Sequence, residues 1–375
     1  MDNFIVSARK YRPANFRSVV GQDAITTTLK NAVKTGQVAQ AFLFCGPRGV
    51  GKTTCARILA KALNCQHLTE DCEPCNECDS CKAFNESAAF NVFELDAASK
   101  NSVDDIRNLV EQIRVPPQGA AYKVYIIDEV HMLSAQAFNA FLKTLEEPPA
   151  YAKFILATTE KHKIMPTILS RCQVYDFKRI TEKDIVAHLQ YVASQEQVNA
   201  DEDALRLVAS KADGALRDAL SIFDQLVTSV GRELTYANAA AHLNVLDVNN
   251  FFRITDFVFS DNVSDALLLL DDILAKGFDG QNFITGLATH FRNLLMAQNP
   301  ATFPLLEASD SVKQQFQQQS RNADRMLLIR ALELTNQCDL NYKEAHNKRL
   351  TIELCLMQIN ANYIYKKVRQ SQERK

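Results

Sequence analysis

One segment constrains the fold of this chain more than any other, and it reads Gly46-Pro47-Arg48-Gly49-Val50-Gly51-Lys52-Thr53. It follows an apolar run at 41–45 and precedes a helical run that begins at Thr54 and continues to Leu63. Closely spaced glycines let backbone N–H groups turn inward around phosphate oxygens, and the helix N-terminus, with Thr54 in its first turn, adds its dipole. In such a loop Lys52 reaches the outer phosphates of ATP, and Thr53 can ligate magnesium (Mg²⁺). The alternative, a glycine-rich turn with a chance lysine, does not account for this setting.

Further apolar, β-rich runs in the first half predict a sheet. They are bounded by turn residues and occupy Val92–Leu95, Lys123–Ile127, Phe154–Thr158 and Val174–Phe177. Such runs are typical of strands buried on both faces of a parallel sheet, so we expect an α/β domain over residues 1–178.

After Ile180 the apolar spacing becomes helical. Helical patterns occupy Glu182–Glu196, Glu202–Lys211, Ala215–Ser229, Val263–Ala275, Asp279–Ala297 and a long Arg325–Val368 region interrupted near Asn341. We expect a small helical domain over 179–243, a second helical domain over 244–368 and a polar tail at 369–375.

Composition narrows the function classes. Hydrophobic residues make up 47% of the chain, and 42 Lys and Arg stand against 44 Asp and Glu, as in an ordinary globular protein. This balance excludes nucleic-acid binding by bulk positive charge, so such binding needs a local basic surface or several subunits. With no apolar run of about 18 residues and no signal-peptide core at the start, we expect a cytoplasmic protein without a membrane partner.

Polar residues end two of the predicted strands. The run at 123–127 is followed by Asp128 and Glu129, which suit a Mg²⁺ contact through water and polarisation of an attacking water, respectively. The run at 154–158 is followed by Thr159, which can hydrogen-bond that water or a phosphate from a strand between the other two. Two acids that open a helix, or threonines that merely favour strands, are the structural alternatives.

Cysteines gather between residues 65 and 81. The spacing Cys65-x9-Cys75-x2-Cys78-x2-Cys81 offers four thiolates, which suits a closed structural zinc (Zn²⁺) site. Cys72 is a fifth candidate ligand, and His67 is a weaker substitute. A redox pair explains the pattern less well, because it leaves the remaining cysteines without a role.

Several longer motifs add to these features. They are Ala8-Arg9-Lys10-Tyr11-Arg12-Pro13 with Phe16, Val19-Val20-Gly21-Gln22, Asp128-Glu129-Val130-His131-Met132-Leu133, Leu145-Glu146-Glu147-Pro148-Pro149, Ser170-Arg171-Cys172 and Gly214-Ala215-Leu216-Arg217-Asp218-Ala219-Leu220-Ser221. With the glycine-rich loop and the inserted cysteines, they resemble the gamma/tau subunits of the bacterial DNA polymerase III clamp loader. The resemblance runs densely over residues 4–230 and continues beyond only as helical character.

The resemblance implies an AAA+ ATPase fold with a zinc-binding insertion, a helical lid and an all-α oligomerisation collar. It places Thr159 as a first sensor, Arg217 as a second sensor in the lid, and Arg171 as a finger that reaches a neighbouring subunit's nucleotide. It also implies that the adenine end of ATP is held by Tyr11, Arg12, Pro13, Val20 and Gly21. The four cysteines at 65, 75, 78 and 81 fall on the family's zinc positions, and Cys72 departs from the pattern.

The implied activity is that of an ATP-driven motor in a ring-like pentamer. Its partners are delta-type and delta-prime-type subunits, further copies of itself, the sliding clamp and primed template DNA. A non-hydrolysing stator and another AAA+ machine, such as a branch-migration helicase or an unfoldase, are the competing functions. No polymerase signature is present, so we expect no nucleotidyltransferase chemistry although the family is part of a DNA-directed DNA polymerase holoenzyme. The end at Lys375 suits the short form, or a truncation of the longer tau form.

Overall fold

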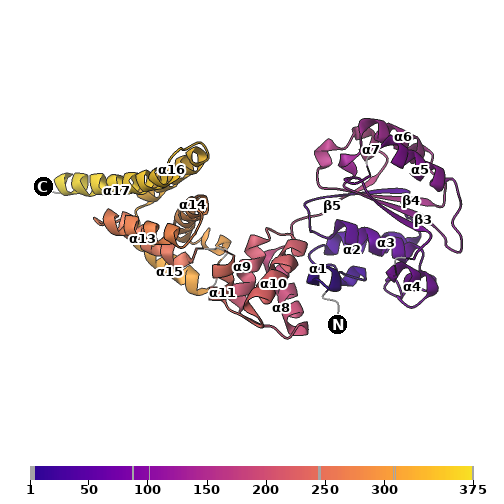
Figure 1. Cartoon of the computed structure of the whole chain (residues 1–375), viewed down its shortest axis with the longest axis horizontal. Helices are drawn as coiled ribbons and strands as arrows, with labels where there is room; N and C mark the ends of the chain where they lie inside the picture. The colour runs from indigo at the N-terminus through magenta and orange to yellow at the C-terminus, as the bar shows by residue number, and fades with distance from the viewer. Residues whose placement is uncertain are drawn as a thin grey trace. The chain divides into compact units, whose positions relative to one another are not determined.

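The computed structural model describes residues 5–86, 88–100, 102–243, 246–306, 308 and 310–373 (Figure 1). The boundary between its two compact units falls between Thr235 and Tyr236. Within the described residues, no helix combines the length and the apolar character that a membrane span requires. The finer division at 178, 243 and 368 stays a prediction, and residues 374–375 of the expected tail lie outside the described residues.

The first unit is built on a five-stranded sheet of order β2-β3-β4-β1-β5, whose neighbouring strands are all parallel. The strands are β1 (Ala41–Cys45), β2 (Val92–Asp96), β3 (Lys123–Asp128), β4 (Ala152–Thr158) and β5 (Gln173–Asp176). The predicted parallel α/β sheet is therefore confirmed. Full burial was expected of every strand, but β2 and β5 are partly exposed because each forms an edge of the sheet.

Helices cover both faces of this sheet, as Figure 1 shows. One face packs on α2 (Asp23–Thr35) and α3 (Lys52–Leu63), and the other packs on α5 (Val103–Ile113) and α6 (Ala135–Glu146). Shorter elements connect these layers: α1 (Ser7–Lys10), η1 (Phe16–Ser18), α4 (Asp79–Asn85), η2 (Val130–Met132), η3 (Lys161–Lys163) and α7 (Pro166–Leu169). Two separate apolar cores result, one on each face.

The helical part of the first unit follows the sheet. It consists of α8 (Glu182–Gln195), α9 (Glu202–Lys211) and α10 (Leu216–Val230), close to the predicted ranges. A two-residue parallel pair, β6 (Asn199–Ala200) with β7 (Glu233–Leu234), was not predicted, because two residues are too few to show a strand period.

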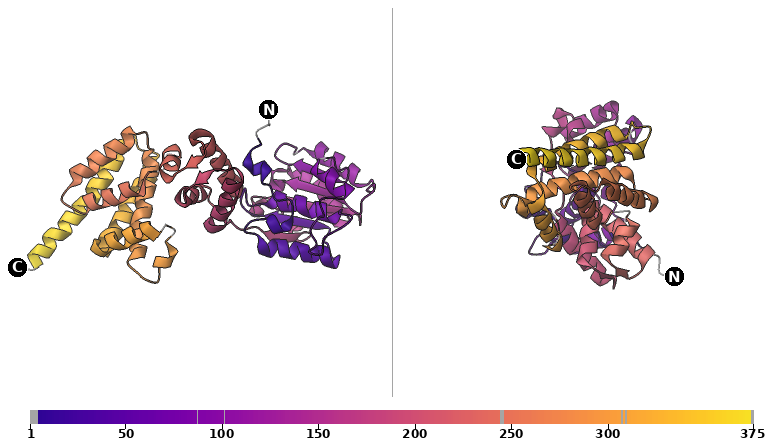
Figure 2. Two further views of the ribbon diagram at one scale, coloured as in Figure 1. Left: turned by 90° about the horizontal axis from the view of Figure 1, so that it is seen from below. Right: turned by 90° about the vertical axis from the view of Figure 1, so that its left-hand side faces the viewer.

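The second unit is helical throughout its described residues apart from turns and connections. Its elements are α11 (Tyr236–His242), α12 (Val248–Val258), α13 (Val263–Ala275), α14 (Gly280–Ala297), η4 (Phe303–Leu305), α15 (Asp310–Asn322), α16 (Arg325–Tyr342) and α17 (Lys348–Glu373). One apolar core joins α12 to α17, and Figure 2 shows α17 in yellow as its long last helix. The interruption predicted near Asn341 is the connection between α16 and α17.

Candidate nucleotide site and cysteine cluster

The candidate nucleotide site lies where three neighbouring strands end. The order β3-β4-β1 places the end of β4 between the acidic end of β3 and the glycine-rich loop that follows β1. Cys45, the last residue of β1, pairs with Thr158, the last residue of β4. The expected position of the Thr159 strand, between the other two, is confirmed, and ligands of open parallel sheets bind at this edge.

The glycine-rich loop adopts backbone conformations that require glycine. Gly46, Gly49 and Gly51 have φ angles of 146°, 77° and 101°. A Cβ on Gly46 would also approach the carbonyl oxygen of Phe177 to 2.4 Å. Substitution there would therefore move the loop relative to the residues that follow β5.

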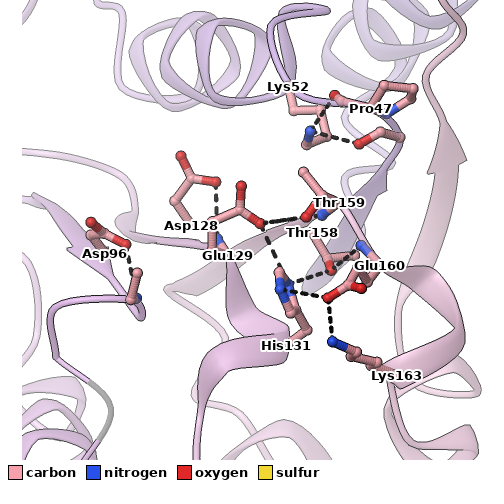
Figure 3. A network of polar contacts seen from close by, with 12 residues as sticks. Pro47, Lys52, Asp96, Asp128, Glu129, His131, Thr158, Thr159, Glu160 and Lys163 are labelled. Atoms are coloured by element: carbon pink, nitrogen blue, oxygen red, sulfur yellow. Dashed lines mark hydrogen bonds and ion pairs between the residues drawn. The ribbon is translucent and has the colours of Figure 1, made fainter. Parts of the chain in front are cut away.

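Lys52 is curled into this loop. Its side chain is buried, and Nζ donates to the carbonyl oxygens of Gly46 at 2.7 Å and Pro47 at 2.6 Å (Figure 3). Burial lowers the pKa of Lys52, and the negative charges of Glu129 and Asp128 oppose that shift. The ammonium is thus held by neutral acceptors, which a charged phosphate can replace with stronger hydrogen bonds.

The two candidate magnesium ligands meet directly. The hydroxyl of Thr53, in the first turn of α3, donates to Oδ2 of Asp128 at 2.6 Å. Mg²⁺ prefers hydroxyl, carboxylate and water oxygens in this kind of small cluster. The residues present therefore fit a magnesium ion at the start of α3.

Glu129 and Thr159 are also in contact. Oε2 of Glu129 accepts from the Thr159 hydroxyl at 3.0 Å and from the Thr159 backbone N–H at 3.3 Å. Glu129 is a non-glycine residue with a φ of 47°, a conformation that turns the chain sharply after β3. The structure thus brings together the proposed water-polarising carboxylate and the proposed sensor.

His131 is a residue of this network that the sequence did not single out as functional. Its Nδ1 lies 3.4 Å from Oε2 of Glu129 and 3.0 Å from the hydroxyl of Thr158. Its Nε2 lies 3.0 Å from Oε2 of Glu160, which Lys163 contacts in turn at 2.6 Å (Figure 3). The signal in the sequence was its position two residues after Glu129, but only the fold reveals Glu160 opposite it.

Arg217 reaches the glycine-rich loop from α10. Its backbone N–H donates to the carbonyl oxygen of Gly49 at 3.4 Å, and its Cβ lies 3.5 Å from the position that a Cβ on Gly49 would take. Desolvation by neighbouring groups lowers the pKa of Arg12, and the positive charges of Arg57 and Arg217 add to this effect. Arg12 of the N-terminal segment and Arg217 of α10 are therefore close enough for their charges to interact.

The remaining residues assigned to adenine lie on the same N-terminal segment. The hydroxyl of Tyr11 donates to Glu196 at the end of α8, and its ring packs edge-on against Tyr191 at 6.2 Å between centroids. Pro13 and Val20 are half-buried. Gly21 is exposed, and a Cβ added to it would lie 3.0 Å from the side chain of Ile180. The segment thus spans the junction between the sheet and α8.

Arg171 is not brought to this site. It precedes β5, whereas the glycine-rich loop follows the adjacent β1, so the two lie toward opposite ends of parallel strands. Its guanidinium donates to Oε1 of Glu146 at 2.8 Å and to the carbonyl oxygen of Thr167 at 2.7 Å.

The cysteines chosen from the sequence form one cluster. The sulfur atoms of Cys65, Cys75, Cys78 and Cys81 all lie within 4.8 Å of one another, and those of Cys75 and Cys81 are 3.9 Å apart. Tetrahedral zinc with Zn–S bonds of about 2.3 Å separates its sulfurs by about 3.8 Å, so this donor set fits zinc. Among the described residues, Cys72 and His67 are not part of the group.

Comparisons with known proteins agree with this geometry. Residues 21–181 match a family model described as DNA polymerase III, delta subunit. Residues 184–231 match one described as the ATPase lid domain of a DNA polymerase III clamp loader subunit. The DNA polymerase III subunit gamma of Buchnera aphidicola subsp. Acyrthosiphon pisum is 34% identical over 361 residues, which cover 95% of this chain and 99% of that protein. This chain belongs to the DNA polymerase III gamma/tau family.

Longer members of the gamma/tau family extend beyond the matched region. The tau subunit of Bacillus subtilis is 41% identical over 94% of this chain, and the matched region spans 62% of that protein. The tau subunit of Escherichia coli is 38% identical over 79% of this chain, and the match spans 46% of that protein. Membership in the gamma/tau family confirms the predicted fold class, an AAA+ sheet domain followed by a helical lid and further helices.

Proposed function

We propose that this chain is the ATP-driven motor subunit of a DNA polymerase III clamp loader, which opens a sliding clamp and loads it on primed DNA during replication. One observation carries the proposal most directly. Thr53 contacts Asp128, and Glu129 contacts Thr159, at the ends of neighbouring strands beside a buried Lys52. These are the groups that phosphoryl transfer to water needs in one place.

Each group has a separate task in this proposal. The backbone N–H groups of residues 48–54 and the ammonium of Lys52 bind the phosphates. Thr53 and Asp128 would hold Mg²⁺, and the bound ion would supply positive charge that neutralises the phosphates. Glu129 accepts a proton from water, and Thr159 orients the carboxylate of Glu129 through the bond described above.

In this proposal, the lid changes position with the state of the nucleotide because α10 contacts the glycine-rich loop. The contact between Gly49 and Arg217 supports direct coupling between α10 and the glycine-rich loop, which is the phosphate-binding loop of this proposal. A shift of α10 must move a residue of that loop. Loss of the γ-phosphate would then release bonds made from both the sheet and the lid. ATP is spent on a change of conformation.

The proposed partners follow from the family. They are delta-type and delta-prime-type clamp-loader subunits, further copies of this chain, the sliding clamp and primed template DNA. Because the formal net charge is only −2, we expect DNA contacts to be local and made to phosphates, and therefore sensitive to salt.

The hydrolysing motor is preferred over a stator of the same assembly. A stator needs neither a buried lysine in the phosphate-binding loop nor a hydroxyl paired with an acidic strand end, and this chain has both. The cysteine cluster and the second helical unit favour a clamp loader over another AAA+ machine.

The test is ATP turnover by the reconstituted assembly with and without clamp and primed template. A motor predicts turnover that rises when both are present and falls when Glu129→Gln is introduced. Unchanged turnover in Glu129→Gln assemblies would show that another subunit supplies the activity.

A further inference from the structure

The cysteine-containing segment carries a buried carboxylate that the nucleotide site does not explain. Glu73, between Cys65 and Cys75, is only 8% exposed and is the one buried acidic residue among those the structure describes. Its Oε2 accepts from the backbone N–H of Phe16 at 2.7 Å, and its Oε1 accepts from that of Arg17 at 3.0 Å. Lys30 of α2 pairs with Oε1 at 2.8 Å. Carboxylates are rarely buried this far without a specific set of partners.

The cluster fixes where this carboxylate lies. The N–H of Cys75 donates to the sulfur of Cys65 at 3.3 Å, which closes the base of the loop between them. Within the loop, the backbone N–H of Thr69 donates to the carbonyl oxygen of Glu73 at 3.0 Å, and the Thr69 hydroxyl accepts from the N–H of Glu73 at 3.0 Å. Glu73 is therefore anchored by a small, closed loop whose two ends are candidate metal ligands.

On its other side, Glu73 holds a segment that packs against the phosphate-binding loop. Phe16 is 1% exposed and shares a core with Val50 of that loop. The side chain of Val19 lies 3.9 Å from the position that a Cβ on Gly51 would take. The side-chain amide of Gln22 donates to the carbonyl oxygen of Lys178 at 2.8 Å and is 3.5 Å from that of Val50.

We propose that Glu73 is a positioning residue through which the cysteine loop holds residues 16–22 in place against the phosphate-binding loop, so that the integrity of the cysteine cluster sets nucleotide affinity. The carboxylate satisfies two N–H groups at the start of η1, which otherwise have no acceptor within that short turn. This inference rests on the proposed nucleotide site, and it assigns the cysteine cluster a task beyond its own stability.

The decisive variant is Glu73→Gln in the full chain. The amide keeps the size of the side chain but offers one acceptor oxygen in place of two and no charge for Lys30. We expect the Kd for MgADP, measured by calorimetry, to rise about fivefold. The substitution weakens the charged hydrogen bonds of Glu73, and we expect part of the lost free energy to be transmitted to the phosphate-binding loop. Hydrogen exchange at the amides of Phe16 and Arg17 should accelerate at least tenfold without nucleotide.

Two controls separate positioning from general loss of stability. Glu77→Gln changes an exposed carboxylate of the same segment and should leave the Kd unchanged. Ile106→Val removes a buried methyl group in the core on the other face of the sheet, which costs roughly 1 kcal/mol of stability, and should also leave the Kd unchanged. Zinc removal from the wild-type chain by a chelator should reproduce the exchange and affinity changes of Glu73→Gln. It should add little to them in the variant.

The outcomes are distinct. A wild-type Kd in Glu73→Gln, or an equal loss in Ile106→Val, overturns the inference while leaving the nucleotide site intact. Failure of the wild-type chain to bind MgADP overturns the proposed function and this inference together. If Glu73→Gln does not fold, the chelator comparison on the wild-type chain decides, and unchanged affinity and exchange after zinc loss refute the positioning role.

Discussion

Arg171→Ala should abolish hydrolysis in the assembly while sparing nucleotide binding by the isolated chain. The reason lies in the register of β1 and β5. Gln173 pairs with Phe42 and Asp176 with Cys45, so about 10 Å of ladder separates the start of β5 from the phosphate-binding loop. Arg171 lies two residues before that start and is held there by Glu146. Because it is remote from its own loop, we expect it to act on the nucleotide of a neighbouring subunit.

The expected magnitude comes from the charge that develops during phosphoryl transfer. A guanidinium placed at the γ-phosphate oxygens accelerates this step by roughly 10³ to 10⁵, so assemblies carrying Arg171→Ala should lose at least about a thousandfold in turnover. The Kd of the isolated chain for MgADP should stay within about twofold of wild type, because the residue is remote from its own loop.

Mixed assemblies provide the sharpest assay. Chains with Lys52→Ala and chains with Arg171→Ala should together recover partial turnover wherever a wild-type arginine meets a wild-type loop. Arg206, an exposed arginine of α9 paired with Glu202, is the matched control, and its alanine variant should behave as wild type. If the isolated Arg171→Ala chain loses the same fraction of basal hydrolysis as the assembly, the residue acts within its own subunit and the reasoning is refuted.

Other expectations follow from single sites. Lys52→Ala should remove nucleotide binding measured by calorimetry and leave the melting temperature near wild type; retained affinity would argue against the phosphate-binding loop. Cys78→Ser should lower the zinc content from about one per chain, whereas Cys72→Ser should not, and metal analysis showing the reverse would reassign the ligands. Burial lowers the pKa of His290 from 6.5 to about 4, so the folded state disfavours protonation. Stability of the second unit should therefore fall as the pH drops from 6.5 toward 4, by up to about 3 kcal/mol in denaturant titrations, and a His290→Phe chain with the same slope would refute this cause.

Much of the fold was predictable because buried strands and amphipathic helices repeat a pattern over many residues. The runs at 41–45 and 123–127 match β1 and all but the last residue of β3, and the helices at 202–211 and 263–275 match α9 and α13. The apolar pattern predicts the bounds of an element less accurately where the element is only partly buried. The edge strand β5 begins one residue earlier than expected, because its exposed side chains carry little apolar signal.

The placement of the candidate site residues was predictable for a different reason. Lys52, Asp128 and Thr159 each belong to a motif whose residue types suit one ligand, and each follows or ends a strand, so the parallel order brings them to the same edge. Tyr11 shows the limit of motif reasoning. Its position was assigned to adenine, and the structure adds a contact with Glu196 of the lid helices that no local pattern encodes.

His131 and Glu73 escaped the sequence reasoning because their roles depend on pairs of residues far apart in the chain. Glu73 is 57 residues from Phe16 in the sequence. His131 and Glu160 are separated in the sequence by α6 and β4, yet their side chains are in contact. A buried carboxylate is invisible in a sequence, since most acidic residues are exposed and nothing local marks the exception. Motifs identify groups that contact a ligand directly, whereas groups that position other residues become recognisable only when burial and hydrogen-bond partners are known. Glu73 lies outside the motifs, and His131 has no assigned role within its motif, so substitution of these two residues tests the fold's contribution to nucleotide binding.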